Sequence, residues 1–253
     1  MNKNHIGETI INNYGSIITL IKYESYSHIL VRFDNGYEKW CTYENFKNKS
    51  IKSPYCKTVY NHGYVGEGEY SSKLNHNIYQ SWIDVLKRSY SNRISNKWET
   101  YKNVTCCEEW FNFQNFAKWY DENYYVVDGE KMHLDKDILI KNNKIYSPDT
   151  CIFVPQRINE LFIKTNKLRG NLPIGVSYLK NINKFQATCK TFTKRGSASY
   201  SNYLGCFKTP LEAFNVYKQF KEKYIKQVAD EYKNKIPQKL YEAMYRYEIE
   251  ITD

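Results

Sequence analysis

Apolar and polar residues alternate along much of the first 54 residues, as expected for strands with one buried face. The alternation is clearest at 15–25 and 28–40, and an Asp-Asn-Gly sequence at 34–36 predicts a tight turn. We therefore predict a small β-barrel over residues 1–54. Its aromatic side chains are expected to form either a core or a binding cage: Tyr23, Tyr26, Phe33 and Trp40.

The pattern becomes helical after an irregular connector at 55–75 that is rich in Gly, Tyr and polar residues. Residues 76–92 carry apolar side chains at three-to-four-residue spacing, which predicts a first helix. Residues 108–122 predict a second helix with one aromatic face. We expect this face to be buried in a core.

Residues 134–159 combine short apolar runs with a central Asn-Asn pair. They predict a strand, a tight turn, a second strand and a helix that begins near Pro155. Together with the preceding helices, this ββα segment defines a predicted domain over 76–163.

The remainder of the chain, 164–253, predicts one further domain. A polar linker at 164–173 precedes three candidate strands, and a long helix then begins at Thr209 and runs to about residue 234. Thr209 and Glu212 form a capping-box pattern with Pro210 at the first helical position, and Pro237 begins a last short helix. The fold class is therefore predicted to be α+β.

The chain has a formal net charge of +10 and a pI of about 9.0, so we expect a polyanionic partner. Nucleic acid is the first candidate, an anionic membrane surface is the second, and a merely solvated basic surface is the alternative. No apolar run approaches the roughly 18 residues of a membrane helix. The first residues lack an apolar secretory segment, which predicts a cytoplasmic protein.

The seven cysteines do not form a Cys-x-x-Cys pair anywhere. This spacing argues against a zinc ribbon and against a secreted disulfide framework, so no zinc is expected and a reducing compartment fits best.

Candidate chemistry is concentrated in the ββα segment. Asp135 and Asp137 are two residues apart and are expected on one face of the first strand, together with His133. Asn159 on the following helix is expected to return to the same point. Hard oxygen ligands of this kind suit Mg²⁺ or another divalent metal.

Residues 79–160 resemble a phage-type HNH-like endonuclease family. The resemblance implies a ββα metal site that hydrolyses a phosphodiester in DNA, in the cytoplasm of a bacterial host. The residues that carry it are Tyr79, Trp82, Arg88, Tyr90, Cys107, Trp110, Phe113, Phe116, Trp119, Leu134, Asp135, Lys136, Asp137, Tyr146, Ser147, Pro148, Cys151 and Asn159.

The chain departs from that family at Lys136, which stands where the catalytic His is expected. A lysine of ordinary pKa is protonated at neutral pH and is a poor base, although it suits phosphate binding. His133 is then the candidate base, and Asp135, Asp137 and Asn159 are the candidate metal ligands.

Residues 169–228 resemble the Apetala-two domain, which also occurs in phage and homing endonucleases. The resemblance rests on Gly175–Val176, Lys184–Lys190, Tyr203–Phe207 and Thr209–Ala213. It implies a three-stranded sheet that enters the major groove of duplex DNA and is backed by one helix. The residues expected to contact DNA are Ser177, Leu179, Lys180, Lys184, Gln186, Thr188, Lys190, Lys194, Arg195 and Tyr203.

Three hypotheses follow. The first is a DNA-binding homing-type endonuclease or a degenerate derivative of one. The second is a non-catalytic DNA-binding regulator or counter-defence protein that acts through a host protein. The third is an adaptor whose barrel binds an acidic protein. The sequence leaves the target, the protein partner and the oligomeric state open.

Overall fold

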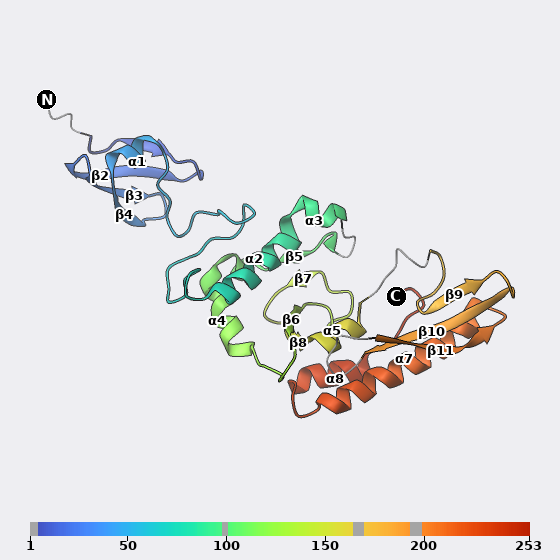
Figure 1. The fold of residues 1–253 in the computed structure, drawn as a ribbon. Coiled ribbons are helices and arrows are strands. Elements are labelled where there is room, and N and C mark those ends of the chain that lie inside the picture. Colours follow the sequence, from blue (N-terminus) through green and yellow to red (C-terminus); the bar gives the residue numbers. More distant parts are fainter. Residues whose placement is uncertain (1–4, 98–100, 164–169, 193–198) are drawn as a thin grey trace. The chain divides into compact units, whose positions relative to one another are not determined.

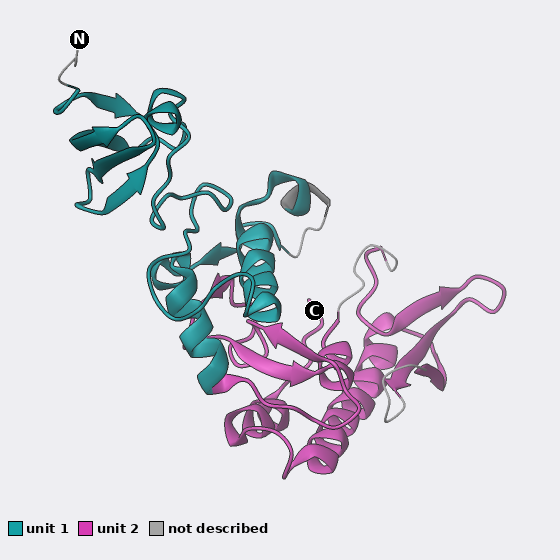
Figure 2. Cartoon of the chain, turned by 60° about the vertical axis from the view of Figure 1, so that its left-hand side comes forward, with its two compact units in different colours: residues 1–122 teal, residues 123–253 magenta. Residues whose placement is uncertain are grey.

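A computed structural model describes residues 5–97, 101–163, 170–192 and 199–253. The fold is mixed α and β, and the chain divides into two compact units, residues 1–122 and 123–253 (Figure 2). Within the described ranges, we find no helix that is long and apolar enough to cross a membrane. All seven cysteines are free thiols.

The first unit begins with a four-stranded antiparallel sheet, in which neighbouring strands are consecutive along the chain (Figure 1). Its buried residues include Ile18, Leu20, Ile29 and Val31, which alternate along the two central strands as predicted. The elements are β1 (Thr9–Ile11), β2 (Ile17–Ser25), β3 (His28–Phe33), β4 (Glu38–Cys41) and a one-turn helix α1 (Tyr43–Lys47).

The four aromatic residues that were predicted to form a core or a binding cage divide between core and surface. Phe33 is buried, whereas Tyr26 and Trp40 are exposed. The ring of His28 stacks on Trp40 at a centroid distance of 4.2 Å. Phe33, one of the residues considered for the cage, therefore belongs to the core, and the ring of Trp40 is already stacked on His28.

The connector 55–75 contains no helix or strand, as predicted, and is followed by the helical part of the first unit. Trp82, Trp110, Phe113 and Phe116 are fully buried there, which confirms the expected aromatic core. The predicted second helix begins with a 3-10 turn that breaks at Asn112. The elements are α2 (His76–Tyr90), α3 (Asn92–Lys97), β5 (Thr105–Cys106), η2 (Glu108–Phe111) and α4 (Phe113–Asn123).

The second unit begins with the ββα segment, and its strand pairing differs from the predicted hairpin. Strand β6 (Met132–Asp135) pairs antiparallel with β8 (Ile152–Pro155), in register His133 opposite Val154 and Asp135 opposite Ile152. The strand after the Asn-Asn turn, β7 (Ile145–Tyr146), does not pair with β6. The predicted tight hairpin is therefore wrong, whereas the helix begins as expected, with Pro155 as N-cap of α5 (Gln156–Leu161).

The C-terminal part contains the three predicted strands and the long helix. The sheet has the order β11-β10-β9, formed by β9 (Val176–Leu179), β10 (Lys184–Phe192) and β11 (Ser199–Phe207). Helix α7 (Pro210–Tyr232) begins with the complete Thr209–Glu212 capping box. Helix α8 (Gln238–Arg246) follows, with Pro237 as its N-cap.

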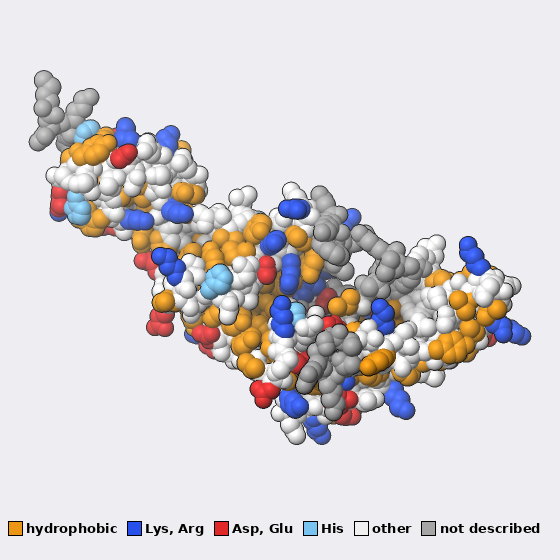
Figure 3. Space-filling view, in the orientation of Figure 1, with side chains coloured by type: hydrophobic (Ala, Val, Ile, Leu, Met, Phe, Trp, Pro, Cys, Tyr) orange, Lys and Arg blue, Asp and Glu red, His pale blue; other side chains and the backbone are white. Residues whose placement is uncertain are grey.

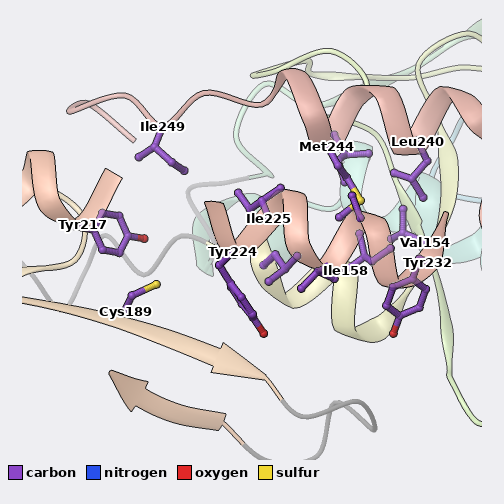
Figure 4. Close-up of a cluster of buried hydrophobic side chains, with 14 of the residues drawn as sticks. Val154, Ile158, Cys189, Tyr217, Tyr224, Ile225, Tyr232, Leu240, Met244 and Ile249 are labelled. Atoms are coloured by element: carbon purple, nitrogen blue, oxygen red, sulfur yellow. The ribbon is translucent and has the colours of Figure 1, made fainter. Parts of the chain in front are cut away.

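One hydrophobic core joins the ββα segment to the C-terminal sheet and helices (Figure 4). Val154 and Ile158 from the ββα segment belong to the same buried cluster as Cys189 of β10 and Ile225 of α7. Leu240 and Met244 of α8 complete it. The ββα segment and the sheet are therefore held on a common core within the second unit.

A buried ion pair adds to this junction. Arg157 of α5 donates to a carboxylate oxygen of Glu231 in α7 at 2.6 Å, and the Arg157 residue is only 5% exposed. The guanidinium also lies 5.8 Å from the ring centroid of Tyr232.

Candidate metal centre and nucleic-acid interface

Asp135 is the last residue of β6 and turns the chain out of the strand. Its Oδ1 accepts hydrogen bonds from the backbone N–H groups of Asp137 at 2.9 Å and Ile138 at 2.7 Å. Such short-range bonds from an Asp side chain compete with strand extension. Asp137 consequently lies in the loop beyond β6, and the expectation that both carboxylates stand on one strand face is wrong.

The carboxyl of Asp135 has a perturbed pKa. Burial raises the pKa of Asp135 to about 6, and the nearby charge of Asp137 acts in the same direction. The two backbone hydrogen bonds oppose this rise because they favour the charged form. A carboxyl whose pKa is shifted by burial together with a neighbouring charge is a common property of functional sites.

Lys136 is buried, with 6% of the residue exposed. Its Nζ donates to Oδ2 of Asp137 at 2.9 Å and to the backbone oxygen of Asn143 at 3.1 Å. The ammonium therefore holds the loop together in this structure. Phosphate binding by Lys136 stays a prediction.

Asn143 fixes the same loop, and sequence reasoning did not identify it. Its Nδ2 donates to the backbone oxygens of Lys136 and Ile145, each at 2.7 Å, and its Oδ1 accepts from the Ile145 N–H at 3.2 Å. The preceding Asn142 has a positive φ of 65°. The Asn-Asn pair that we interpreted as a hairpin turn is thus a loop clamp, and the known preference of Asn for backbone bonding in loops was the available signal.

The remaining candidate residues lie on the two elements expected for them. His133 is two residues before Asp135 on β6 and so points to the same side of the strand. Asn159 lies on α5, partly exposed. The convergence of His133 and Asn159 on Asp135 stays a prediction.

The side chains around Asp135 offer few ligands to a divalent cation. Among the described residues, no group of three or more His, Cys, Asp or Glu side chains is arranged to hold a metal. Mg²⁺ commonly needs only one or two carboxylates, because it keeps several waters and binds substrate phosphate. Oδ2 of Asp135 and Oδ1 of Asp137 accept no hydrogen bond from the described residues, so two hard oxygens remain that fit such a cation.

The C-terminal sheet has one face against α7 and one open face. Ala187 and Cys189 are buried, and Phe185 is partly buried beside them, which confirms the predicted inward positions of β10. The other face carries the intervening residues of β10 and their cross-strand neighbours. These are Lys184 opposite Leu179, Gln186 opposite Ser177 and Cys206, Thr188 opposite Tyr203, and Lys190 opposite Ser201.

The structure therefore brings seven of the predicted DNA-contacting residues to a single face: Ser177, Leu179, Lys184, Gln186, Thr188, Lys190 and Tyr203. Lys180 is exposed directly after β9. Lys194 and Arg195 lie outside the described residues.

The positive charge of the chain is concentrated around this sheet, a feature that our sequence-based prediction did not identify. Residues 161–211 contain no Asp or Glu and carry seven Lys and two Arg, nearly the whole formal net charge of +10. Lys180, Lys184, Lys190 and Lys208 are exposed, and none forms an ion pair with a described residue. Figure 3 shows Lys and Arg side chains standing out from the surface of this part.

Comparison with known proteins gives no further information: no family model, curated protein or solved structure matches the chain.

Proposed function

We propose that the chain is a phage-encoded protein that binds duplex DNA through the open face of the β9–β11 sheet. In this proposal the ββα segment is an HNH-like centre, either an active metal-dependent endonuclease or a degenerate derivative. The observation that carries the proposal is the acid-free, basic stretch 161–211, whose exposed lysines surround a sheet face of the right residue types.

The sheet suits DNA for electrostatic and geometric reasons. Each lysine that neutralises a phosphate releases counterions, so affinity from such contacts falls steeply with salt. Three strands at about 4.8 Å spacing span about 10 Å between the outer strands, and the major groove is about 12 Å wide. Two adjacent strands of the sheet, whose axes are about 4.8 Å apart, can therefore lie in the groove with the open face toward the base edges.

The ββα centre supplies the residues for phosphodiester hydrolysis. Asp135 and Asp137 would hold one Mg²⁺ through their unbonded oxygens. The bound cation would polarise the scissile phosphate and neutralise charge on it. His133 is the proposed base that accepts a proton from the attacking water. Lys136 and Asn143 keep the carboxylates in place by closing the loop.

A binding experiment tests the DNA contact. We expect the full chain to bind a duplex with an affinity that falls as salt rises. Lys184→Ala and Lys190→Ala should each lower the salt slope by about 1. The matched control is Lys226→Ala, because Lys226 is exposed on α7 outside the sheet face. Equal losses in the sheet variants and in this control would contradict the proposed face.

A nicking experiment tests the centre. Supercoiled plasmid with Mg²⁺ or Mn²⁺ should be nicked by the wild-type chain, and Asp135→Ala should abolish the activity. Absence of nicking by the wild type, or full nicking by the variant, refutes the enzymatic part. Binding would be measured in parallel, so that a loss of DNA affinity is not mistaken for a loss of catalysis.

The second candidate function is a non-catalytic DNA-binding regulator or counter-defence protein that acts through a host protein in the bacterial cytoplasm. Lys136 favours it, since the residue at the usual position of the catalytic His is an ammonium committed to the loop. In this version the N-terminal sheet is a barrel-like module that contacts the protein partner. Salt-dependent duplex binding without nicking would support this second candidate.

A further inference from the structure

Gln186 occupies the middle of the open face of the sheet. It lies on β10, the central strand, and its cross-strand neighbours are Ser177 on β9 and Cys206 on β11. The residue is partly buried by these neighbours, and its side-chain amide makes no hydrogen bond with any described residue. Among the described residues, the amide N–H and carbonyl oxygen of Gln186 therefore have no partner and are available to a ligand on the open face.

A β-bulge in β11 arranges the surroundings of Gln186. Tyr203 and Cys206 are three residues apart, so an unbroken strand would put them on opposite faces. The register shifts between Ala187 and Thr188, and Gly205 adopts a φ of +128° there. Tyr203 therefore pairs with Thr188 on the same open face as Cys206, and its side chain is 64% exposed. Bulges commonly re-aim side chains in this way at functional surfaces.

Gln186 and Thr188 lie at the centre of β10 on the open face, and their side chains favour an A·T base pair. Gln pairs bidentately with the N6 and N7 atoms of adenine, and the methyl group of Thr contacts the thymine methyl. Within the described part of the sheet no arginine is present, and arginine is the usual bidentate reader of guanine. Lys184 and Lys190 stand two residues outside this central pair, where their long side chains can reach phosphates.

From these observations we infer that Gln186 is a specificity-determining residue that reads adenine in the major groove. The sheet then prefers A·T pairs at the centre of its site. The inference rests on the proposed DNA contact of this face. Thr188 follows Gln186 by about 6.6 Å along the strand, which places its contact one to two base pairs away. Lys184 and Lys190 add affinity without base preference.

The test is a selection of bound duplexes from a pool with a randomised centre, using the full chain, followed by affinity measurements on single-position variants. We expect A·T at the central position, and replacement by G·C should weaken binding roughly 5- to 100-fold. Gln186→Ala should abolish this difference at that position only. Gln186→Arg should move the preference at the same position to guanine.

A control variant and three outcomes distinguish a failure of the adenine-reading role from a failure of the proposed DNA contact. Lys190→Ala should weaken binding to all sequences by a similar factor and lower the salt slope by about 1. Duplex binding with equal affinity for all central pairs overturns the adenine-reading role alone. A uniform loss for Gln186→Ala across all sequences has the same consequence. Absence of any salt-dependent duplex binding overturns both this inference and the proposed function.

Discussion

The buried ion pair between Arg157 and Glu231 gives the sharpest test of how the second unit is held together. The side chain of Arg157 is 6% exposed and that of Glu231 is 29% exposed, so the cation is the more deeply buried partner. Burial acts to lower the pKa of Arg157, but the hydrogen bond with Glu231 and two tyrosine contacts outweigh it and raise the pKa. The guanidinium therefore stays charged, and removal of its counterion leaves a buried charge behind.

The expected loss in the free energy of unfolding follows from this difference in burial between Arg157 and Glu231. Removing one partner of a fully buried pair typically costs about 3–5 kcal/mol. Water can reach Glu231, so we expect Glu231→Gln to lower the free energy of unfolding by about 2–3 kcal/mol. Arg157→Met should cost less, about 1–2 kcal/mol, because the carboxylate of Glu231 can hydrate where it stands. The double variant should cost less than the sum of the single variants, since neither charge is then left alone.

Hydrogen exchange by peptide provides the assay, because it follows each unit separately. Peptides from α5 and α7 should lose protection in the single variants, while peptides from residues 1–122 serve as an internal control. All five tryptophans lie in residues 1–122, so tryptophan fluorescence reports the first unit only and should not change. A larger effect of Arg157→Met than of Glu231→Gln would refute the reasoning about which charge is buried. Additive effects would show that the pair is not coupled.

Substitutions at three further positions have predictable results. Asp135 has a folded-state pKa of about 6 against an ordinary 3.8, so the folded state binds a proton more tightly than the unfolded state and its stability falls as pH rises from about 4 to 6. Asp135→Asn should remove this pH dependence in urea titrations. Asp135→Ala should lower the free energy of unfolding by about 1–3 kcal/mol, because two backbone N–H groups lose their acceptor. Burial lowers the pKa of Lys221 below its ordinary 10.5, so stability should rise with pH as that value is approached, and Lys221→Met should be more stable at pH 7 by about 1–2 kcal/mol in thermal unfolding. Gly175→Ala should cost about 2–4 kcal/mol in the same measurement, because φ is +77° and the added Cβ would lie 2.1 Å from a ring carbon of Tyr217.

Elements with local signals were predictable from the sequence. The start of helix α7 is set by three neighbouring residues. The side chains of Thr209 and Glu212 accept hydrogen bonds from the first N–H groups, and Pro210 has no N–H group to satisfy. The inward and outward positions of β10 followed from strict alternation, since a strand between a helix and an open face has period two. Such features depend on neighbours a few residues away.

The candidate site depended on distant partners and was less predictable. Strand β6 pairs with β8 across a loop of sixteen residues, a choice that the alternation of its four residues does not determine. The predicted position of Asp137 was wrong because the Asp135 side chain accepts hydrogen bonds from the N–H groups of Asp137 and Ile138 and ends the strand. Asn143 looked like an ordinary turn residue, and its role as a clamp appears only when Lys136 and Ile145 are brought together.

The shared core has a consequence for the proposed endonuclease. Val154 and Ile158 of the ββα segment pack in the same cluster as Cys189 of the sheet, and Arg157 adds a buried pair to α7. Moving the centre relative to the sheet would expose these groups, and each buried aliphatic side chain alone contributes about 1.5–3 kcal/mol. The distance along DNA between the bases read by the sheet and the phosphate presented to Asp135 should therefore be fixed. An active enzyme would then nick at one constant offset from its central A·T position, whereas a flexible connection would give a spread of nicks.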